Sequence, residues 1–389
     1  MKIKKLSILG ATGSIGENTL AVARANPDRL QIVGVASNKN YEKLAKIALE
    51  FGAKYAAIYD AQAYEAAKKS GLFGSSIKLL CGEEGLAEVA TLSEIDTLVA
   101  AVVGTTALKP TLAAIEAGKD IALANKELLV MAGKFVMGAA KRKNVQMLPL
   151  DSEHNAIFQC LVGERKDDIA KLLITASGGM FKDFTLEQMR QIKPEQALKH
   201  PNWNMGPKVT IDSSTLANKG LEIIEAKWLF DVSPEQIQVV VQRQSIVHSM
   251  VQFVDGSIKA HFSPPSMTFA ISHSLLFGKR GLPAVQTLDF AKPLCLDFAP
   301  PDTDRFPCLK HAFAALRAGG TATTCFNAAN EVAVANFVKG RLPWIEIASV
   351  VGETLAAVEH RDPQSLGDVL EADAQARRAA ESIAAKIGL

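Results

Sequence analysis

Cysteine is scarce in this sequence. The five cysteines lie far apart, are odd in number and form no CxxC pair, which argues against a disulfide framework and a structural zinc site. This usage fits a reducing cytoplasm, so we expect a cytoplasmic protein. No apolar run is long enough to span a bilayer. The N-terminal lysines precede a short apolar run and a glycine turn rather than a cleavage site, so a signal peptide is not predicted.

A strong charge of one sign is also lacking. The formal net charge is only +2, so we expect neither nucleic acid nor a membrane surface as a partner. Hydrophobic residues make up 48% and charged residues 22% of the chain, which is the balance of a globular protein with a packed core. The length of 389 residues suggests two or three domains.

A glycine turn follows the first apolar run. Residues 5–9 predict a strand and residues 17–25 a helix, and between them lie Gly10, Gly13 and Gly16. Such glycines let the backbone approach a pyrophosphate at a helix N-terminus. The GxxGxxG spacing is a variant of the usual fingerprint, and a tight turn of any α/β protein is the alternative. The position between strand and helix favours nucleotide binding.

The second strand indicates which dinucleotide is bound. It is predicted at residues 30–36 and is followed by Ser37, Asn38, Lys39 and Asn40. NAD sites usually have an acidic residue here for the ribose 2′-hydroxyl. A lysine among neutral polar groups suits a 2′-phosphate, so NADPH is favoured over NADH, with an ordinary polar loop as the alternative.

Helices and strands continue to alternate up to residue 124. The pattern predicts helices at 41–51, 60–70 and 110–117 and strands at 55–58, 97–103 and 120–124. This alternation predicts a parallel, doubly wound sheet with ligands at the carboxyl ends of its strands. Gly10, Gly104 and Asn125 fall at these ends. Lys126 comes next and could either stabilise an oxyanion or pair with Glu127.

Two carboxylates follow the next predicted strand, at residues 145–150. Asp151 and Glu153 point the same way in an extended chain, and converging carboxylates repel each other unless a cation lies between them. Oxygen ligands suit Mg²⁺ or Mn²⁺ rather than zinc. The alternative is a helix start, in which Ser152 caps a helix over 154–160 and Glu153 lies in its first turn.

A second polar region begins after the strand predicted at residues 171–175. Ser177 is followed by two glycines, which form either an anion nest or a plain turn. Trp203 lies in a glycine-containing loop that we interpret as a substrate lid. An extended segment is predicted at 208–211, and residues 212–215 can cap a helix at 216–230.

That helix would present Asn218, Lys219 and Glu222 on one face. A surface Lys–Glu pair of small energetic value is the alternative. The density of polar groups, which includes Ser213, favours a phosphate and metal site in which Glu222 supplies a third carboxylate.

The remaining chain predicts a hairpin, a linker and a bundle. The hairpin covers residues 238–262 around an Asp-Gly turn and offers a surface for dimer formation; His248 and His261 on it are left without a role. Residues 283–307 predict a surface linker. Helices are predicted at 308–318, 324–338 and 343–359, with a last helix capped by Ser365 or Asp368. The polar motif at 327–331 is interpreted as a helix cap.

The order of seven motifs adds a resemblance. The sequence contains GATGSIG, LANKE, PLDSEHNAIFQ, ASGG, HPNWNMG, DSSTLANKGLE and NAANE, and over nearly its whole length it resembles the 1-deoxy-D-xylulose 5-phosphate reductoisomerase family. The resemblance implies a homodimer that converts this sugar phosphate to 2-C-methyl-D-erythritol 4-phosphate, in the non-mevalonate isoprenoid pathway. The implied cofactors are NADPH and a divalent metal, namely Mg²⁺, Mn²⁺ or Co²⁺.

The resemblance also implies an architecture of class α/β. It comprises an N-terminal Rossmann-like parallel sheet, a central α+β catalytic domain with a hairpin, and a C-terminal helical bundle. The corresponding ranges are 1–150 for NADPH binding, 151–275 for catalysis, metal binding and dimerisation, 276–306 for the linker and 307–389 for the bundle.

Site residues follow from the same resemblance. The implied metal ligands are Asp151, Glu153 and Glu222, which together with Lys126 form the catalytic set. The implied substrate contacts are Lys126, Ser152, Glu153, Ser177, His200, Trp203, Met205, Ser213, Asn218, Lys219 and Glu222. The implied cofactor contacts are Thr12, Gly13, Ser14, Ile15, Asn38, Lys39, Asn40, Asn125, Glu127 and Gly206.

Three departures from the family pattern stand out. The loop has Asn204 and Pro207 where Ser or Thr and a basic residue are frequent, which could alter its closure. Ser37 and Asn38 replace a familiar Ala-Gly pair. Residues 266–268 read Ser-Met-Thr after a proline, where Asp-Met-Arg is usual; this change could alter the dimer surface and leaves the carboxylates intact.

Two other functions compete with this interpretation. A semialdehyde-type dehydrogenase shares a similar glycine turn but needs a catalytic cysteine after a strand, and no cysteine here has that setting. A non-catalytic NADPH sensor would keep the glycine turn but would not need clustered carboxylates.

Overall fold

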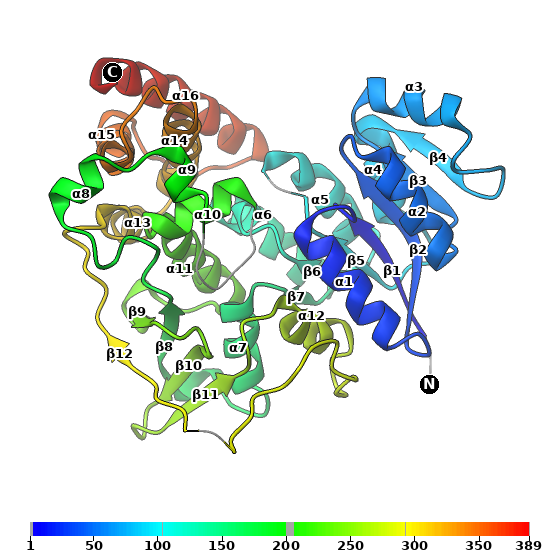
Figure 1. The fold of residues 1–389 in the computed structure, drawn as a ribbon, viewed down its shortest axis with the longest axis horizontal. Coiled ribbons are helices and arrows are strands. Elements are labelled where there is room, and N and C mark those ends of the chain that lie inside the picture. The colour runs from blue at the N-terminus through cyan, green and yellow to red at the C-terminus, as the bar shows by residue number, and fades with distance from the viewer. Residues whose placement is uncertain (1–2, 103, 200–205, 292, 389) are drawn as a thin grey trace. The chain divides into compact units, whose positions relative to one another are not determined.

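The computed structural model describes residues 3–102, 104–199, 206–291 and 293–388. The chain divides into two compact units, whose elements are labelled in Figure 1. Unit 1 comprises residues 1–128, 136–155 and 266–287, and unit 2 comprises residues 129–135, 156–265 and 288–389. The four-part division at residues 150, 275 and 306 stays a prediction.

Unit 1 is built on a seven-stranded sheet with the order β4-β3-β2-β1-β5-β6-β7. Each neighbouring pair is parallel, which confirms the expected doubly wound sheet. In β1, Leu6, Ile8 and Leu9 are completely buried, as is typical of a strand covered on both faces. The strands are β1 (Lys4–Leu9), β2 (Leu30–Ser37), β3 (Tyr55–Ile58), β4 (Lys78–Cys81), β5 (Thr97–Ala100), β6 (Asp120–Leu123) and β7 (Met147–Pro149).

The helices of unit 1 start and stop at local sequence signals. Asn40 caps α2 (Tyr41–Phe51) by accepting a hydrogen bond from the Lys43 N–H, and the helix ends at Gly52 in the left-handed conformation. A cap of this kind contributes about 1 kcal/mol. The other helices are α1 (Ser14–Ala25), α3 (Ala61–Ser70), α4 (Gly82–Thr91), α5 (Leu108–Glu116) and α12 (Met267–Leu275), while α6 (Glu127–Lys143) and α7 (Ser152–Cys160) supply residues to both units.

Unit 2 has a mixed five-stranded sheet with the order β11-β10-β8-β9-β12. β8 and β9 are parallel and the other pairs antiparallel. The predicted hairpin exists between β10 and β11, but one continuous arm over 238–254 is wrong, because Ser245 has φ 55° in a turn that separates β9 from β10. The strands are β8 (Ile169–Ala176), β9 (Ile237–Gln242), β10 (Val247–Phe253), β11 (Ile258–Phe262) and β12 (Phe298–Ala299).

A helical group completes unit 2. α14 contacts α13, α15 and α16 (Figure 1), which confirms the bundle. α11 approaches α13 closely at Gly220, where an added Cβ would lie 2.6 Å from the Ala312 Cβ. The helices are α8 (Leu186–Arg190), α9 (Pro194–Ala197), α10 (Pro207–Ser214), α11 (Ala217–Phe230), α13 (Pro307–Ala318), α14 (Ala322–Val338), α15 (Ile347–Ala357) and α16 (Leu366–Ile387).

Several local expectations are wrong. The segment 208–211 is helical rather than extended, because Pro207 begins α10 at a position where its fixed φ suits a helix. Leu216, with φ 60°, takes the cap position of α11 in place of the predicted residues 212–215, although the Thr215 hydroxyl accepts a hydrogen bond from the Ala217 N–H at the start of that helix at 3.3 Å. Ser152 lies inside α7 as its first residue. The motif 327–331 lies in the middle of α14, which begins after Thr321, so it is not a cap.

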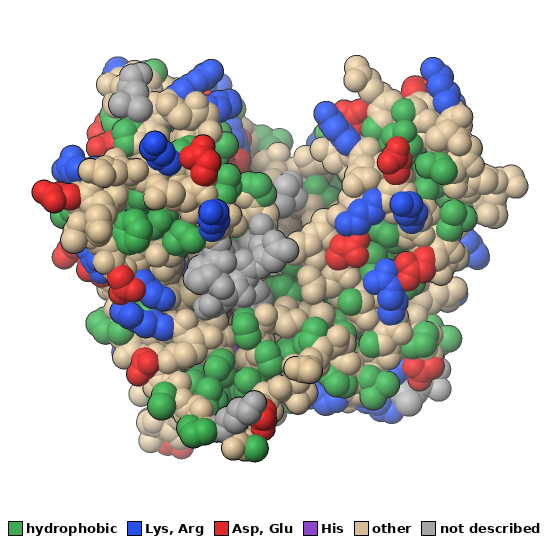
Figure 2. All heavy atoms as spheres, in the orientation of Figure 1, with side chains coloured by type: hydrophobic (Ala, Val, Ile, Leu, Met, Phe, Trp, Pro, Cys, Tyr) green, Lys and Arg blue, Asp and Glu red, His purple; other side chains and the backbone are tan. Residues whose placement is uncertain are grey.

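The face drawn in Figure 2 shows no dominant charge. On the face drawn in Figure 2, the coloured Lys and Arg side chains are interspersed with Asp and Glu, as the net charge of +2 predicts. Of the helices formed by the described residues, none combines the length and the hydropathy needed to cross a membrane.

Candidate active site

The predicted site residues of unit 1 lie along one edge of its sheet. Because parallel strands end at the same edge, the loops after β2, β1, β5, β6 and β7 form a row in that order. Lys39 follows β2, Thr12 follows β1, Asn125 follows β6 and Asp151 follows β7. The sheet thus brings the dinucleotide candidates and the first carboxylates to one edge of unit 1.

The glycine turn after β1 has no room for a side chain at Gly10 or Gly16. Gly10 has φ 87°, and a Cβ there would lie 2.5 Å from the Ala101 carbonyl oxygen. Gly13 precedes α1, and no described side chain caps that helix. The N–H groups of its first turn are therefore directed at the turn, where a phosphate can accept from them. Gly13 and Ser14 are exposed there, and Ile15 is half-buried.

The loop after β2 contains one largely exposed cation. The Lys39 side chain is 73% exposed and lies 3.5 Å from Asp60. Asn38 is exposed beside it, whereas the Asn40 side chain is used to cap α2. The described residues therefore leave the Lys39 ammonium accessible to an anionic group.

Asn125 and Glu127 are both buried at the start of α6. The Asn125 amide donates to the carbonyls of Val102 and Gly104, the latter at 2.8 Å, and its oxygen accepts from the Leu128 N–H at 3.2 Å. These bonds hold the loop after β5 against the loop after β6. The side chain of Asn125 thus has a structural use besides its proposed cofactor contact.

Lys126 pairs with Asp151. The ammonium lies 2.5 Å from the carboxylate, and both side chains are about nine-tenths buried, at 10% and 11% exposure. His154 approaches the other carboxylate oxygen at 3.6 Å. Burial alone would raise the pKa of Asp151, but the charge of Lys126 and the contact with His154 hold it well below its usual range. Asp151 is therefore ionised, the state in which a carboxylate can bind a cation.

Glu153 lies beside Asp151 in the first turn of α7. The Glu153 N–H donates to Asp151 at 3.3 Å, and the Ser152 hydroxyl donates to the Glu153 carboxylate at 2.5 Å. The helix N-terminus favours both negative charges. The helix-start alternative is thus correct for the backbone, and it still leaves the two carboxylates next to each other.

In unit 2, the serine–glycine turn after β8 rests on the end of α10. Gly178 and Gly179 both have positive φ, at 86° and 74°, and the Gly179 N–H donates to the Ser177 hydroxyl at 3.3 Å. A Cβ on Gly179 would lie 2.9 Å from the Ser213 carbonyl oxygen. The structure therefore places the turn that carries Ser177 against the helix end that carries Ser213.

The polar face of α11 is buried. Glu222 accepts from Asn218 at 2.5 Å and from Lys219, and Lys219 and Glu222 are only 4% and 1% exposed. The alternative of a surface Lys–Glu pair is therefore wrong. Burying two charges is costly, and a ligand that uses them would account for the arrangement. Gly206 precedes α10, while His200, Trp203 and Met205 lie outside the described residues.

Four other polar residues were not predicted to have a role in the site. His154 and Glu225 are completely buried, and Asp212 and Asn330 are buried and bonded to each other. Glu225 follows Glu222 by three positions on α11, a spacing that places both on one helix face. The bond between Asp212 and Asn330 spans 118 residues, so no local pattern could have revealed it.

Together, a dinucleotide-type sheet, an ionised aspartate beside a second carboxylate, and a buried polar helix face define an α/β nucleotide-dependent enzyme. Three family models match: 1-deoxy-D-xylulose 5-phosphate reductoisomerase over residues 6–133, its C-terminal domain over 147–230, and the DXP reductoisomerase C-terminal domain over 262–379. The chain belongs to the 1-deoxy-D-xylulose 5-phosphate reductoisomerase family, and the resemblance is confirmed.

Relatives match over nearly the full length. The chain is 47% identical to the reductoisomerase of Chlorobaculum tepidum, covering 98% of this chain and 100% of that protein. It is 46% identical to the enzyme of Nitrosomonas europaea, covering 97% and 93%. The solved reductoisomerase of Zymomonas mobilis in complex with NADPH is 41% identical, covers 98% and 99%, and has a TM-score of 0.92.

A second solved relative contains a metal. This DOX-P reductoisomerase, in complex with NADPH, fosmidomycin and magnesium, is 40% identical, covers 99% of this chain and 98% of that chain, and has a TM-score of 0.90. These matches confirm the α/β fold class and its Rossmann-like sheet.

Proposed function

We propose that the protein is a 1-deoxy-D-xylulose 5-phosphate reductoisomerase. It converts this ketose phosphate to 2-C-methyl-D-erythritol 4-phosphate by a skeletal rearrangement followed by hydride reduction, in the non-mevalonate isoprenoid pathway. The observation that carries the proposal is the ionised Asp151 beside Lys126 and Glu153, at the carboxyl edge of a dinucleotide-type sheet. A non-catalytic NADPH sensor would not need this buried charge cluster.

NADPH binds along the carboxyl edge of unit 1 in this proposal. The uncapped start of α1 receives the pyrophosphate, and the exposed Lys39 receives the 2′-phosphate. The solved relatives in complex with NADPH support this cofactor. The proposed contacts are Thr12, Gly13, Ser14, Ile15, Asn38, Lys39, Asn40, Asn125, Glu127 and Gly206.

A divalent cation is held by Asp151, Glu153 and Glu222. Three carboxylates supply only oxygen donors, which suit Mg²⁺, Mn²⁺ or Co²⁺, and the lowered pKa of Asp151 provides a charged ligand. The magnesium in a solved relative supports this choice. When bound, the cation supplies Lewis-acid polarisation of the substrate oxygens and NADPH supplies the hydride.

The side chains of this protein bind and orient the sugar phosphate. Lys126 stabilises the oxyanion that develops on the substrate, and Ser152 contacts a substrate hydroxyl. The phosphate is bound by the turn after β8, the end of α10 and the start of α11, through Ser177, Ser213, Asn218 and Lys219, together with His200. Closure of the loop that carries Trp203 and Met205 excludes water during the reaction.

We further propose a cytoplasmic homodimer that uses an edge of the five-stranded sheet. β11 is an edge strand, and its Ile258 and Phe262 are 52% and 43% exposed. Edge strands with exposed apolar residues pair readily with a second chain.

A nicotinamide absorbance assay tests the activity. NADPH should be oxidised only when the ketose phosphate and Mn²⁺ or Mg²⁺ are both present. Oxidation without metal, or with a semialdehyde in place of the ketose phosphate, would contradict the proposal.

Glu222→Gln tests the metal site, because the amide keeps the shape of the side chain and removes its charge. We expect turnover to fall by at least about 10²-fold, while NADPH binding, followed by nicotinamide fluorescence, persists. Glu235→Gln, on an exposed residue of the same unit, should behave like the wild type. Normal turnover of a folded Glu222→Gln variant would disprove the set of three carboxylate ligands.

A further inference from the structure

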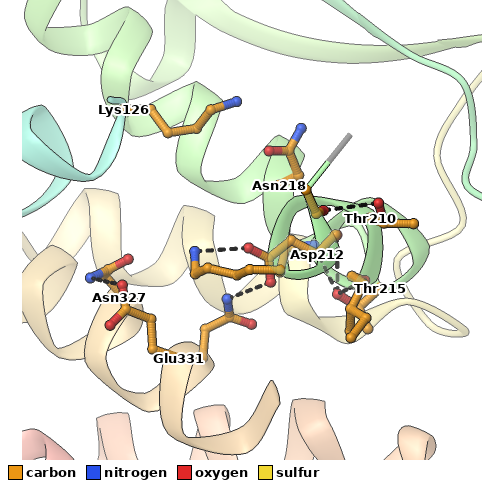
Figure 3. A network of polar contacts seen from close by, with 12 residues as sticks. Lys126, Thr210, Asp212, Thr215, Asn218, Asn327 and Glu331 are labelled. Atoms are coloured by element: carbon orange, nitrogen blue, oxygen red, sulfur yellow. Dashed lines mark hydrogen bonds and ion pairs between the residues drawn. The ribbon is translucent and has the colours of Figure 1, made fainter. Parts of the chain in front are cut away.

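A buried carboxylate connects α10 to the bundle of unit 2. Asp212 accepts hydrogen bonds on both oxygens, from the Lys208 ammonium at 2.9 Å and from the Asn330 amide at 2.8 Å (Figure 3). Asp212 and Asn330 are completely buried. Asn330 belongs to the NAANE motif, which the proposed function does not use.

The NAANE motif is also bonded to α16. Asn327 donates to Glu331 at 3.4 Å (Figure 3). Glu331 in turn accepts from Arg377 of α16 at 2.6 Å, and Arg377 also donates to Asp373 at 2.7 Å. The motif in α14 is therefore held by α16 and itself holds α10.

α10 carries part of the proposed phosphate site. Ser213 directly follows Asp212, and the Ser213 carbonyl lies against Gly179. The Ser214 hydroxyl accepts from Trp344 at 2.9 Å. The end of α10 is thus fixed by contacts on several sides, and the Asp212–Asn330 bond is the charged one among them. If Asn330 could no longer donate, a buried carboxylate oxygen would lose its partner, and the helix end would shift to satisfy it.

We propose that Asp212 and Asn330 are positioning residues for the substrate phosphate: α14 sets the place of Ser213 through this buried bond. The inference rests on the proposed function, in which Ser213 and Lys219 bind the phosphate. Neither Asp212 nor Asn330 touches substrate in this arrangement, and the NAANE motif gains a role at the active site.

Two single variants test the bond. Asn330→Leu keeps the size of the side chain and removes the donor, and Asp212→Leu keeps the approximate size and removes both acceptor oxygens. We expect either change to raise KM for the ketose phosphate about tenfold, with kcat within about twofold and the dissociation constant of NADPH unchanged. Asp212→Leu keeps the test valid if Asn330→Leu does not fold, because Lys208 is partly exposed and can reach water.

An exchange of the two residues is the decisive variant. In Asp212→Asn/Asn330→Asp, the amide at position 212 can accept from Lys208 and donate to the carboxylate at position 330, so the bonds return with reversed polarity. KM should return to within about threefold of the wild type. Asn336→Leu is the control, since Asn336 is also buried on α14 and bonds Val332 and Glu381 instead; it should leave KM unchanged.

Three results overturn the inference: an unchanged KM in both single variants, an exchange variant no better than the singles, or equal losses in kcat and NADPH affinity, which indicate general damage. Ser213→Ala and Lys219→Ala test the phosphate assignment separately from the positioning role of Asp212 and Asn330. If they raise KM while the Asp212 and Asn330 variants do not, the positioning role alone is wrong. If they leave KM unchanged, the phosphate assignment fails as well.

Discussion

Lys39 differs from the buried Lys126 in that most of its side chain is exposed. The Lys39–Asp60 pair, at 3.5 Å and with 73% and 25% side-chain exposure, is weak because water screens exposed charges. The ammonium can therefore leave Asp60 for a cofactor phosphate at small cost. Lys126 has no such freedom, because its charge offsets that of the buried Asp151. The two lysines thus fit the roles of cofactor selection and substrate chemistry respectively.

Lys39→Met tests the selection of NADPH. Loss of a charged hydrogen bond to the 2′-phosphate should raise KM for NADPH by about tenfold or more, while KM for NADH, which lacks that phosphate, stays unchanged. Steady-state kinetics with both cofactors measure the ratio. Lys46→Met, on an exposed residue of α2, should leave the ratio as in the wild type. Equal shifts for the two cofactors would assign Lys39 a structural role only.

Among the elements, the turn after β8 is constrained by two separate effects. Gly179 has a positive φ of 74°, and its missing Cβ leaves space for the Ser213 carbonyl. Gly256, in the turn of the β10–β11 hairpin, has a positive φ of 85° but no described atom within 4 Å of its missing Cβ. An alanine at either position would therefore have a strained backbone, but only the alanine at position 179 would also press its Cβ against a neighbouring atom.

Gly179→Ala and Gly256→Ala separate these effects. Left-handed strain should lower the free energy of unfolding of both variants by about 1–2 kcal/mol, and the contact of the new Cβ with the Ser213 carbonyl should lower it further in Gly179→Ala; thermal or urea denaturation measures both. Only Gly179→Ala should also raise KM for the sugar phosphate, because its Cβ displaces the end of α10. A rise in KM for Gly256→Ala, or none for Gly179→Ala, would show that the contact does not set the geometry of the phosphate site.

The elements also show where local patterns suffice. α2 and β3 occur at the predicted residues, because apolar periodicity, a cap and a terminal glycine all lie within the segment itself. β4 and α4 were not predicted, since β4 has four residues, none of them fully buried, and α4 starts without a side-chain cap from any described residue. α10 was predicted as extended because Val209, Thr210 and Ile211 favour strands, and helix packing overrides that preference.

For the whole molecule, residue types and motif order were sufficient to propose the site. The contacts that hold the site residues in place could not be predicted from the sequence. The carboxylates, lysines and serines lie in short motifs whose chemistry can be read locally. The Asp212–Asn330 bond and the contact between Gly179 and Ser213 join separate segments. Contacts of this kind depend on how distant segments pack against each other. The spacing of apolar and polar residues within one segment does not reveal which other segment it meets.

The proposed dimer makes a prediction at the scale of the molecule. Ile258 and Phe262 lie on one face of β11, since side chains two apart point the same way, and both are exposed on an edge strand. If this edge forms the dimer, Ile258→Lys/Phe262→Lys would bury two like charges against their copies and should shift the protein to monomers in sedimentation equilibrium. Val338→Lys, which replaces an exposed apolar residue at the end of α14, should remain dimeric. A double-lysine variant that is still a dimer at micromolar concentration would place the interface on another surface.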